Sequence, residues 1–98
     1  RLFLRKLAYV FAAPEISRFF GIVIAMHYND HVPPHFHARY GSDRAAISIR
    51  DMTVLEGQLP ARVLGLVVEW GTQHRDELLA DWARSARQLP LVPIAPLE

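Results

Sequence analysis

Cysteine is absent from this 98-residue chain, which excludes disulfides, thiolate metal sites and cysteine nucleophiles. Net charge is nearly absent as well, because 11 Lys and Arg residues oppose 10 Asp and Glu residues and leave a formal charge of +1. The chain as a whole therefore gives no electrostatic reason to expect nucleic acid, and any basic surface must be local. The lack of cysteine fits a reducing cytoplasm.

Long apolar runs are also missing. Residues 1–13 combine basic side chains with a short apolar run, whereas a membrane-spanning helix needs about 20 apolar residues. We predict that residues 1–13 form an N-terminal extension, flexible or a short helix, and that no segment enters a membrane. Residues 14–98 are predicted to form one domain, because so short a chain is too small for two cores. A domain this small gains from a partner or from homo-oligomers.

The distribution of β-branched residues, prolines and glycines predicts an α+β fold. Residues 19–28 are rich in β-branched and aromatic side chains and read as a buried first strand. The paired prolines 33–34 stiffen the loop that follows. Residues 35–40 and 43–50 flank a Gly41-Ser42 turn and form a hairpin. The expected sheet is therefore a three-stranded antiparallel meander.

One long C-terminal helix is predicted to cover one face of this sheet. From Pro60 to about Arg87 the residues are mostly helix formers, with apolar side chains at spacings of three and four that include Val63, Trp70 and Trp82. Glycines within this stretch weaken the helix, since each costs about 1 kcal/mol against alanine.

Other residues of the C-terminal part receive simpler interpretations. His74 lies on the apolar stripe and is predicted to pack in the core. Residues 90–98 contain three prolines and are predicted to be extended and to lie back over the domain. Four acidic residues are predicted to form a solvated helix surface: Glu69, Asp76, Glu77 and Asp81.

The hairpin register separates two faces of the sheet. If Gly41-Ser42 is the turn, Tyr40 pairs with Asp43 and Phe36 lies opposite Ile47. The face under the helix then holds Phe36, Ala38, Ile47 and Ile49. The opposite face is predicted to hold His35, His37, Arg39, Arg44, Ser48 and Arg50.

This His/Arg face has the residue types that phosphodiester chemistry requires. Arginine donates paired hydrogen bonds to phosphate, and histidine gives or takes a proton near neutral pH. His35 and His37 are therefore the candidate catalytic residues, and the candidates for phosphate contact are Arg39, Arg44, Arg50 and Ser48. Three further candidates flank this hairpin strand: Asp30, His31 and Tyr40. The alternative interpretation is an ordinary polar face of an antiparallel sheet.

The histidines also suggest a metal site. His35 and His37 lie on one side of a strand, and His27, His31 or Asp30 could add ligands. This spacing matches no specific signature, and the imidazoles are divided between a strand and a stiff loop. We therefore expect no tightly held zinc and no cofactor, and keep a histidine-based metal enzyme as an alternative.

Two segments, residues 14–24 (PEISRFFGIVI) and 31–41 (HVPPHFHARYG), closely resemble the bacterial family catalogued as domain of unknown function 4160. The resemblance continues to the C-terminal PIAPL of residues 93–97 and covers nearly all of residues 14–98. Family members begin with Met-Pro-Glu-Ile, so residues 1–13 depart from the family pattern. The resemblance implies no established activity. It does imply a partner protein encoded by a neighbouring gene, in an arrangement that resembles toxin–antitoxin operons.

Three functions follow as hypotheses. The first is a small cytoplasmic component of a toxin–antitoxin-like pair whose His/Arg face engages RNA or a partner protein and possesses ribonuclease activity. The second is a non-catalytic protein-binding module or antitoxin-like subunit. The third is a metal-dependent enzyme built on the histidines.

Overall fold

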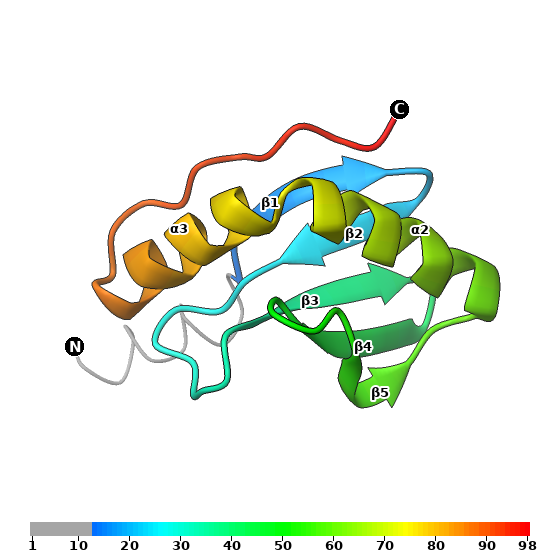
Figure 1. Ribbon diagram of the computed structural model, residues 1–98, viewed down its shortest axis with the longest axis horizontal. Helices are drawn as coiled ribbons and strands as arrows, with labels where there is room; N and C mark the ends of the chain where they lie inside the picture. The colour runs from blue at the N-terminus through cyan, green and yellow to red at the C-terminus, as the bar shows by residue number, and fades with distance from the viewer. Residues whose placement is uncertain (1–12) are drawn as a thin grey trace.

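A five-stranded antiparallel sheet, in the order β1-β2-β3-β4-β5, forms one layer of the computed structural model, which describes residues 13–98. The strands are β1 (Glu15–Phe19), β2 (Ile22–Ala25), β3 (His35–Tyr40), β4 (Asp43–Ser48) and β5 (Val54–Gln58). Two helices, α2 (Ala61–Gln73) and α3 (Arg75–Ala86), lie across one face of this sheet (Figure 1). The fold is α+β as predicted. The prediction for the N-terminal extension falls almost entirely on residues 1–12, outside the described residues.

The sheet has five strands instead of the predicted three. The predicted first strand, residues 19–28, contains β2 but misses β1, which precedes it and ends at Phe19. A tight turn at Phe20 and Gly21 joins the two strands, and Phe19 pairs with Ile22 across it. Both turn residues have positive φ, 51° and 79°. The turn was not predicted because one of its two residues is Phe20, and a bulky residue rarely adopts the left-handed conformation. β5 was predicted as a loop because its sequence lacks the alternation of apolar and polar residues that marks a half-buried strand. In the structure all five of its residues are exposed.

The predicted hairpin register is confirmed. Tyr40 pairs with Asp43, Phe36 with Ile47 and His35 with Ser48. Phe36 and Ile47 are fully buried beneath the helices, as their alternation in the strands predicts. β4 ends at Ser48, however, so the predicted extension of this strand to residue 50 is wrong.

The predicted long helix is two helices that break at His74. This residue has φ −117° and ψ 25°, which is outside the helical range, and it caps both helices. Arg75 begins α3 and donates from Nε to the Ile49 carbonyl oxygen over 3.1 Å, which ties the break to the end of the sheet. Neither helix among residues 13–98 is long and apolar enough to cross a membrane.

Trp70 is the largest fully buried side chain of the core between sheet and helices. Its ring lies 5.4 Å from that of Phe19 and 5.8 Å from that of Phe36. Its indole Nε1 donates to the Ala95 carbonyl oxygen over 2.8 Å, so the C-terminal segment packs against the core as predicted. Trp82 is only partly buried, unlike the prediction from the apolar stripe.

Asp81 is fully buried, which overturns its predicted place on a solvated helix surface. One carboxylate oxygen, Oδ1, accepts from Arg84 Nη1 over 2.8 Å and from the Val92 N–H over 2.9 Å. The C-terminal segment therefore covers this part of α3, as Figure 1 shows for its path along the helix. Glu69, Asp76 and Glu77 are exposed as predicted.

Two glycines provide a matched test of the β4–β5 hairpin. Gly57 has φ +80°, and a Cβ there would overlap the Arg44 carbonyl oxygen, so Gly57→Ala is expected to cost at least about 2 kcal/mol of unfolding free energy. Gly65 lies within α2 with open space around it, so Gly65→Ala is expected to stabilise by about 0.5–1 kcal/mol. Urea denaturation measures the unfolding free energy of both variants. Equal changes in the two would contradict the close approach of Gly57 to the Arg44 backbone.

Candidate functional site

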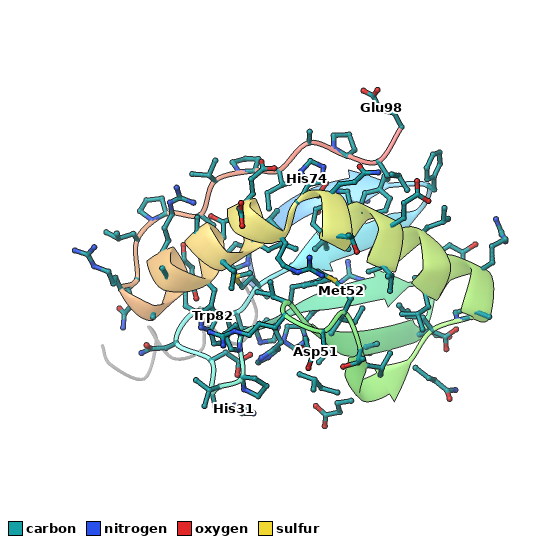
Figure 2. The ribbon with its side chains drawn as sticks, viewed as in Figure 1. His31, Asp51, Met52, His74, Trp82 and Glu98 are labelled. Carbon is teal, nitrogen blue, oxygen red and sulfur yellow. The ribbon has the colours of Figure 1, made fainter. Side chains whose placement is uncertain are left out.

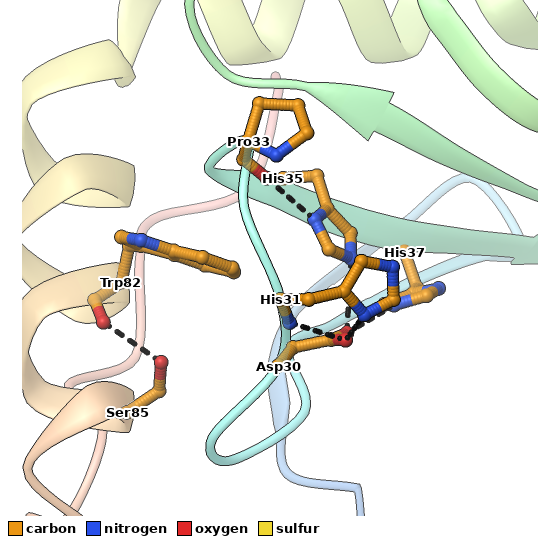
Figure 3. A network of polar contacts seen from close by, with 7 residues as sticks. All are labelled: Asp30, His31, Pro33, His35, His37, Trp82 and Ser85. Carbon is orange, nitrogen blue, oxygen red and sulfur yellow. Dashed lines mark hydrogen bonds and ion pairs between the residues drawn. The ribbon is translucent and has the colours of Figure 1, made fainter.

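Asp30, in the loop between β2 and β3, is the centre of a polar cluster (Figure 3). Its Oδ2 atom lies 2.9 Å from His35 Nε2 and 3.4 Å from His37 Nε2. Its Oδ1 atom accepts from the His31 backbone N–H over 2.9 Å and lies 3.0 Å from His31 Nδ1. One carboxylate therefore joins His31 of the loop to His35 and His37 of β3.

His35 is buried, which corrects its predicted position on the solvent-facing side of the sheet. Only 6% of its side chain is exposed, because the loop folds over it and the Trp82 ring lies 5.2 Å away (Figure 3). Its Nδ1 donates to the Pro33 carbonyl oxygen over 2.8 Å, and its Nε2 faces the Asp30 carboxylate. Both ring nitrogens of His35 therefore face an oxygen atom, and the two contacts fix the orientation of the ring. His35 therefore holds Asp30 in place and has little access to substrate.

The electrostatics of Asp30 favour its ionised form. Burial acts to raise its pKa, but hydrogen bonds from the His31 backbone N–H and from His37, together with the charge of His35, lower the pKa below its usual value. The result is a partly buried carboxylate that stays negative at neutral pH. Such a group attracts cations into the site.

His37 and His27 form a stacked pair beside this carboxylate. Their ring centres are 4.1 Å apart and the planes differ by 19°. Burial and the neighbouring His27 lower the pKa of His37 below its usual value, against the opposing effect of its hydrogen bond to Asp30. With 31% of its side chain exposed, His37 is the member of the predicted catalytic pair that solvent and ligands can reach.

A shallow groove of about 630 Å³ runs over the face of the sheet that the helices leave open. Its floor includes small side chains, among them Ala25 and Ala46, and both His27 and His37 line it. Arg39 and Arg44 line it too, and lie about 7 Å along the strands from His37. The imidazole pair and the arginine pair therefore share one surface.

Arg39 and Arg44 are paired directly across β3 and β4, and both are exposed. Like charges at directly opposed positions destabilise a sheet. Within residues 13–98 neither arginine forms a salt bridge or a hydrogen bond from its side chain, and nearby Glu15 is engaged by Arg18 at 2.7 Å. An anion between the two guanidinium groups would relieve their repulsion.

The other predicted site residues lie outside the groove. Ser48 is buried, and its Oγ accepts from the Asp51 N–H over 3.2 Å. Arg50 is exposed in the turn after β4, so it does not share the sheet face. Tyr40 lies on the helix side, near Gly21 and Arg62. His31 is 90% exposed, contacts Oδ1 of Asp30, and has its ring centre 5.8 Å from that of His35. Figure 2 labels it in the loop at the edge of the molecule.

Sequence reasoning gave His27 too small a role. It was treated as the end of a buried strand and as one of several metal candidates, whereas the structure brings it into contact with His37. Its place after Met26, on the side opposite to that fully buried residue, is the signal that could have found it.

The fold and site define a small α+β protein with an antiparallel meander, two helices on one face, and a His/Asp cluster beside an arginine pair on the other. The model of the family described as "Domain of unknown function (DUF4160)" matches residues 21–83, so the chain belongs to this family. The matched range contains the whole polar cluster and both arginines of the groove. No curated protein and no solved structure matches the chain.

Proposed function

We propose that this protein binds RNA through the open face of its sheet, as the cytoplasmic component of a toxin–antitoxin-like pair. The observation that carries the proposal is the directly opposed pair Arg39 and Arg44 in the groove, with no salt-bridge partner among residues 13–98. Arginine pairs of this kind suit a phosphate group, which accepts hydrogen bonds from both guanidinium groups at once.

The rest of the groove suits a single-stranded ligand. An exposed sheet face with planar side chains is a common platform on which unstacked bases lie. The His27 and His37 rings provide such a platform next to the arginines, and the small side chains of the floor leave room for a base. The nearly neutral chain then binds RNA through Arg39 and Arg44, which share the groove with Glu15 and Glu56.

Binding is better supported than cleavage by the histidine pair predicted from sequence. Catalysis by two imidazoles needs both to reach the phosphodiester, and His35 is buried against Trp82. His37 is the accessible one of the two. The proposed function is therefore RNA recognition, with any chemistry placed at the His37 end of the groove.

The test is the double variant Arg39→Ala/Arg44→Ala, measured by fluorescence anisotropy with a labelled single-stranded RNA. We expect at least about a 10-fold loss of affinity and a salt dependence shallower by about 0.7, since both arginines are placed on one phosphate and each phosphate contact on a single strand contributes about 0.7. Stability should not fall, because both side chains are exposed and repel each other.

The matched control is Arg62→Ala/Arg87→Ala, which removes the same charge from exposed positions outside the groove. Equal losses in both variants would show that only net charge matters and would overturn the assigned face.

If the unchanged protein binds no RNA at low salt, the second hypothesis, a protein-binding module, replaces this one. One observation favours the protein-binding module: β5 is an edge strand, and its exposed residues include Val54 and Leu55. The backbone N–H and C=O groups on its outer side could pair with a strand of a partner protein.

A further inference from the structure

We propose that His27, Asp30 and His37 form a binding site for a divalent transition-metal cation, with Zn²⁺ the best match to the donors. One donor atom from each of these side chains lies within 4.8 Å of the other two. The three residues come from the end of β2, the following loop and β3, so the fold brings together donors that the sequence separates. The proposal therefore replaces the expectation from sequence that no zinc is tightly held. The site lies at the edge of the groove that His27 and His37 line.

The donor set decides which cation fits. Two imidazole nitrogens and one carboxylate oxygen are the protein ligands of many zinc sites that keep a fourth position for water. Imidazole also suits other transition metals, whereas Mg²⁺ prefers an octahedral shell of oxygen atoms. The site is therefore expected to distinguish Zn²⁺ from Mg²⁺.

The distances are close to those that coordination needs. Zinc–ligand bonds of about 2.0–2.1 Å in a tetrahedron place the donors about 3.3 Å apart. Asp30 Oδ2 and His37 Nε2 are already 3.4 Å apart. The remaining donor belongs to His27, whose ring stacks on that of His37 at 4.1 Å. With no pair beyond 4.8 Å, the His27 donor must move closer by at most about 1.5 Å. Binding also requires the His27 ring to turn out of the stack, so that its nitrogen lone pair and that of His37 converge on one cation.

The hydrogen bonds of Asp30 leave one position for a metal. A carboxylate accepts at about four lone-pair sites. His31 occupies Oδ1 through its backbone N–H and its ring, and His35 occupies one site of Oδ2 at 2.9 Å. The fourth site faces His37 across a long contact of 3.4 Å. A cation placed there replaces the weakest contact of the cluster and keeps the others.

His35 acts here as a positioning residue. Its Nε2 lies 2.9 Å from Asp30 Oδ2, its Nδ1 donates to the Pro33 carbonyl oxygen, and the ring is buried against Trp82 (Figure 3). Outer partners of this kind orient a ligating carboxylate and typically change metal affinity by about 10- to 100-fold. The carboxylate is thus oriented before a metal arrives, while the exposed part of His37 keeps the site open to solvent.

The experiment uses the full chain without a histidine tag, titrated with Zn²⁺ by isothermal calorimetry after chelator treatment. We expect one equivalent of Zn²⁺ to bind and Mg²⁺ to give no heat at the same concentrations. Asp30→Asn and His37→Gln should each weaken Zn²⁺ binding by more than about 100-fold, beyond the loss of an outer partner. The matched control His74→Gln removes an imidazole outside this cluster, which bonds Glu77 on α3, and it should keep Zn²⁺ affinity within about 10-fold.

A second measurement does not depend on how the variants fold. In the unchanged protein, Co²⁺ should shift the ring NMR signals of His27 and His37 strongly and leave those of His74, which bonds Glu77 on α3, in place. Absence of Zn²⁺ binding by the folded protein, equal loss in His74→Gln, or Co²⁺ shifts centred on His74 would each overturn the proposal. The Arg39→Ala/Arg44→Ala variant should bind Zn²⁺ normally, so this result is separable from RNA binding.

Discussion

Replacing Trp70 with alanine is expected to lower the free energy of unfolding by about 3–5 kcal/mol. The side chain is fully buried and contacts Phe19 and Phe36, so its removal leaves a large cavity between sheet and helices. It also removes the 2.8 Å hydrogen bond to the Ala95 carbonyl oxygen that ties the C-terminal segment to α2. Small domains have a total stability of about 5–15 kcal/mol, so this variant is expected to be close to unfolding at room temperature.

Urea denaturation followed by circular dichroism measures this loss, and two variants separate its parts. Trp70→Phe keeps most of the volume and removes the indole donor, so it should cost about 1–2 kcal/mol. Trp82→Ala is the matched control, because that indole is only partly buried, and it should cost less than Trp70→Ala. Equal losses for the two tryptophans would contradict the position of Trp70 at the centre of the core.

Arg84→Ala is expected to cost about 3 kcal/mol, although the change removes a side chain that is 36% exposed. Its partner Asp81 has no exposed surface, and without Arg84 this carboxylate remains buried with an uncompensated charge. Its Oδ2 atom already lacks a hydrogen-bond partner among the described residues, so no group stabilises the charge at that oxygen. The Val92 N–H, which donates to Oδ1, then becomes the main contact that remains.

A double-mutant cycle measures this coupling. Asp81→Asn keeps the shape and one acceptor for the Val92 N–H but removes the charge, so it should restore most of the stability in the Arg84→Ala background. Arg87→Ala, at an exposed position just after α3, is the matched control and should change stability by less than about 0.5 kcal/mol. Additive effects of Arg84→Ala and Asp81→Asn would contradict the buried ion pair.

The sequence by itself determined the parts of this protein that depend on local patterns. The β3–β4 register followed from a turn at Gly41 and the alternation of apolar residues, which placed Phe36 opposite Ile47. The helical stripe identified Trp70, and the prolines of residues 90–98 predicted the extended C-terminal segment. Motifs throughout the chain identified the family. Each of these signals is carried by residues close together in the chain, so no distant contact was needed to read it.

Tertiary contacts decided the rest, above all the candidate site. Asp30 reaches His35 and His37 because its loop folds back, and a backbone hydrogen bond of 3.3 Å from Asn29 to the Ser85 carbonyl oxygen ties that loop to α3. Burial of His35 likewise depends on Trp82, 47 positions further along the chain. Alternation predicts which side of a strand a residue faces, but it cannot show whether a distant helix and a loop cover that side. The sequence therefore identified the histidines, and only the folded chain distinguished the buried His35 from His27 and His37, which line the groove.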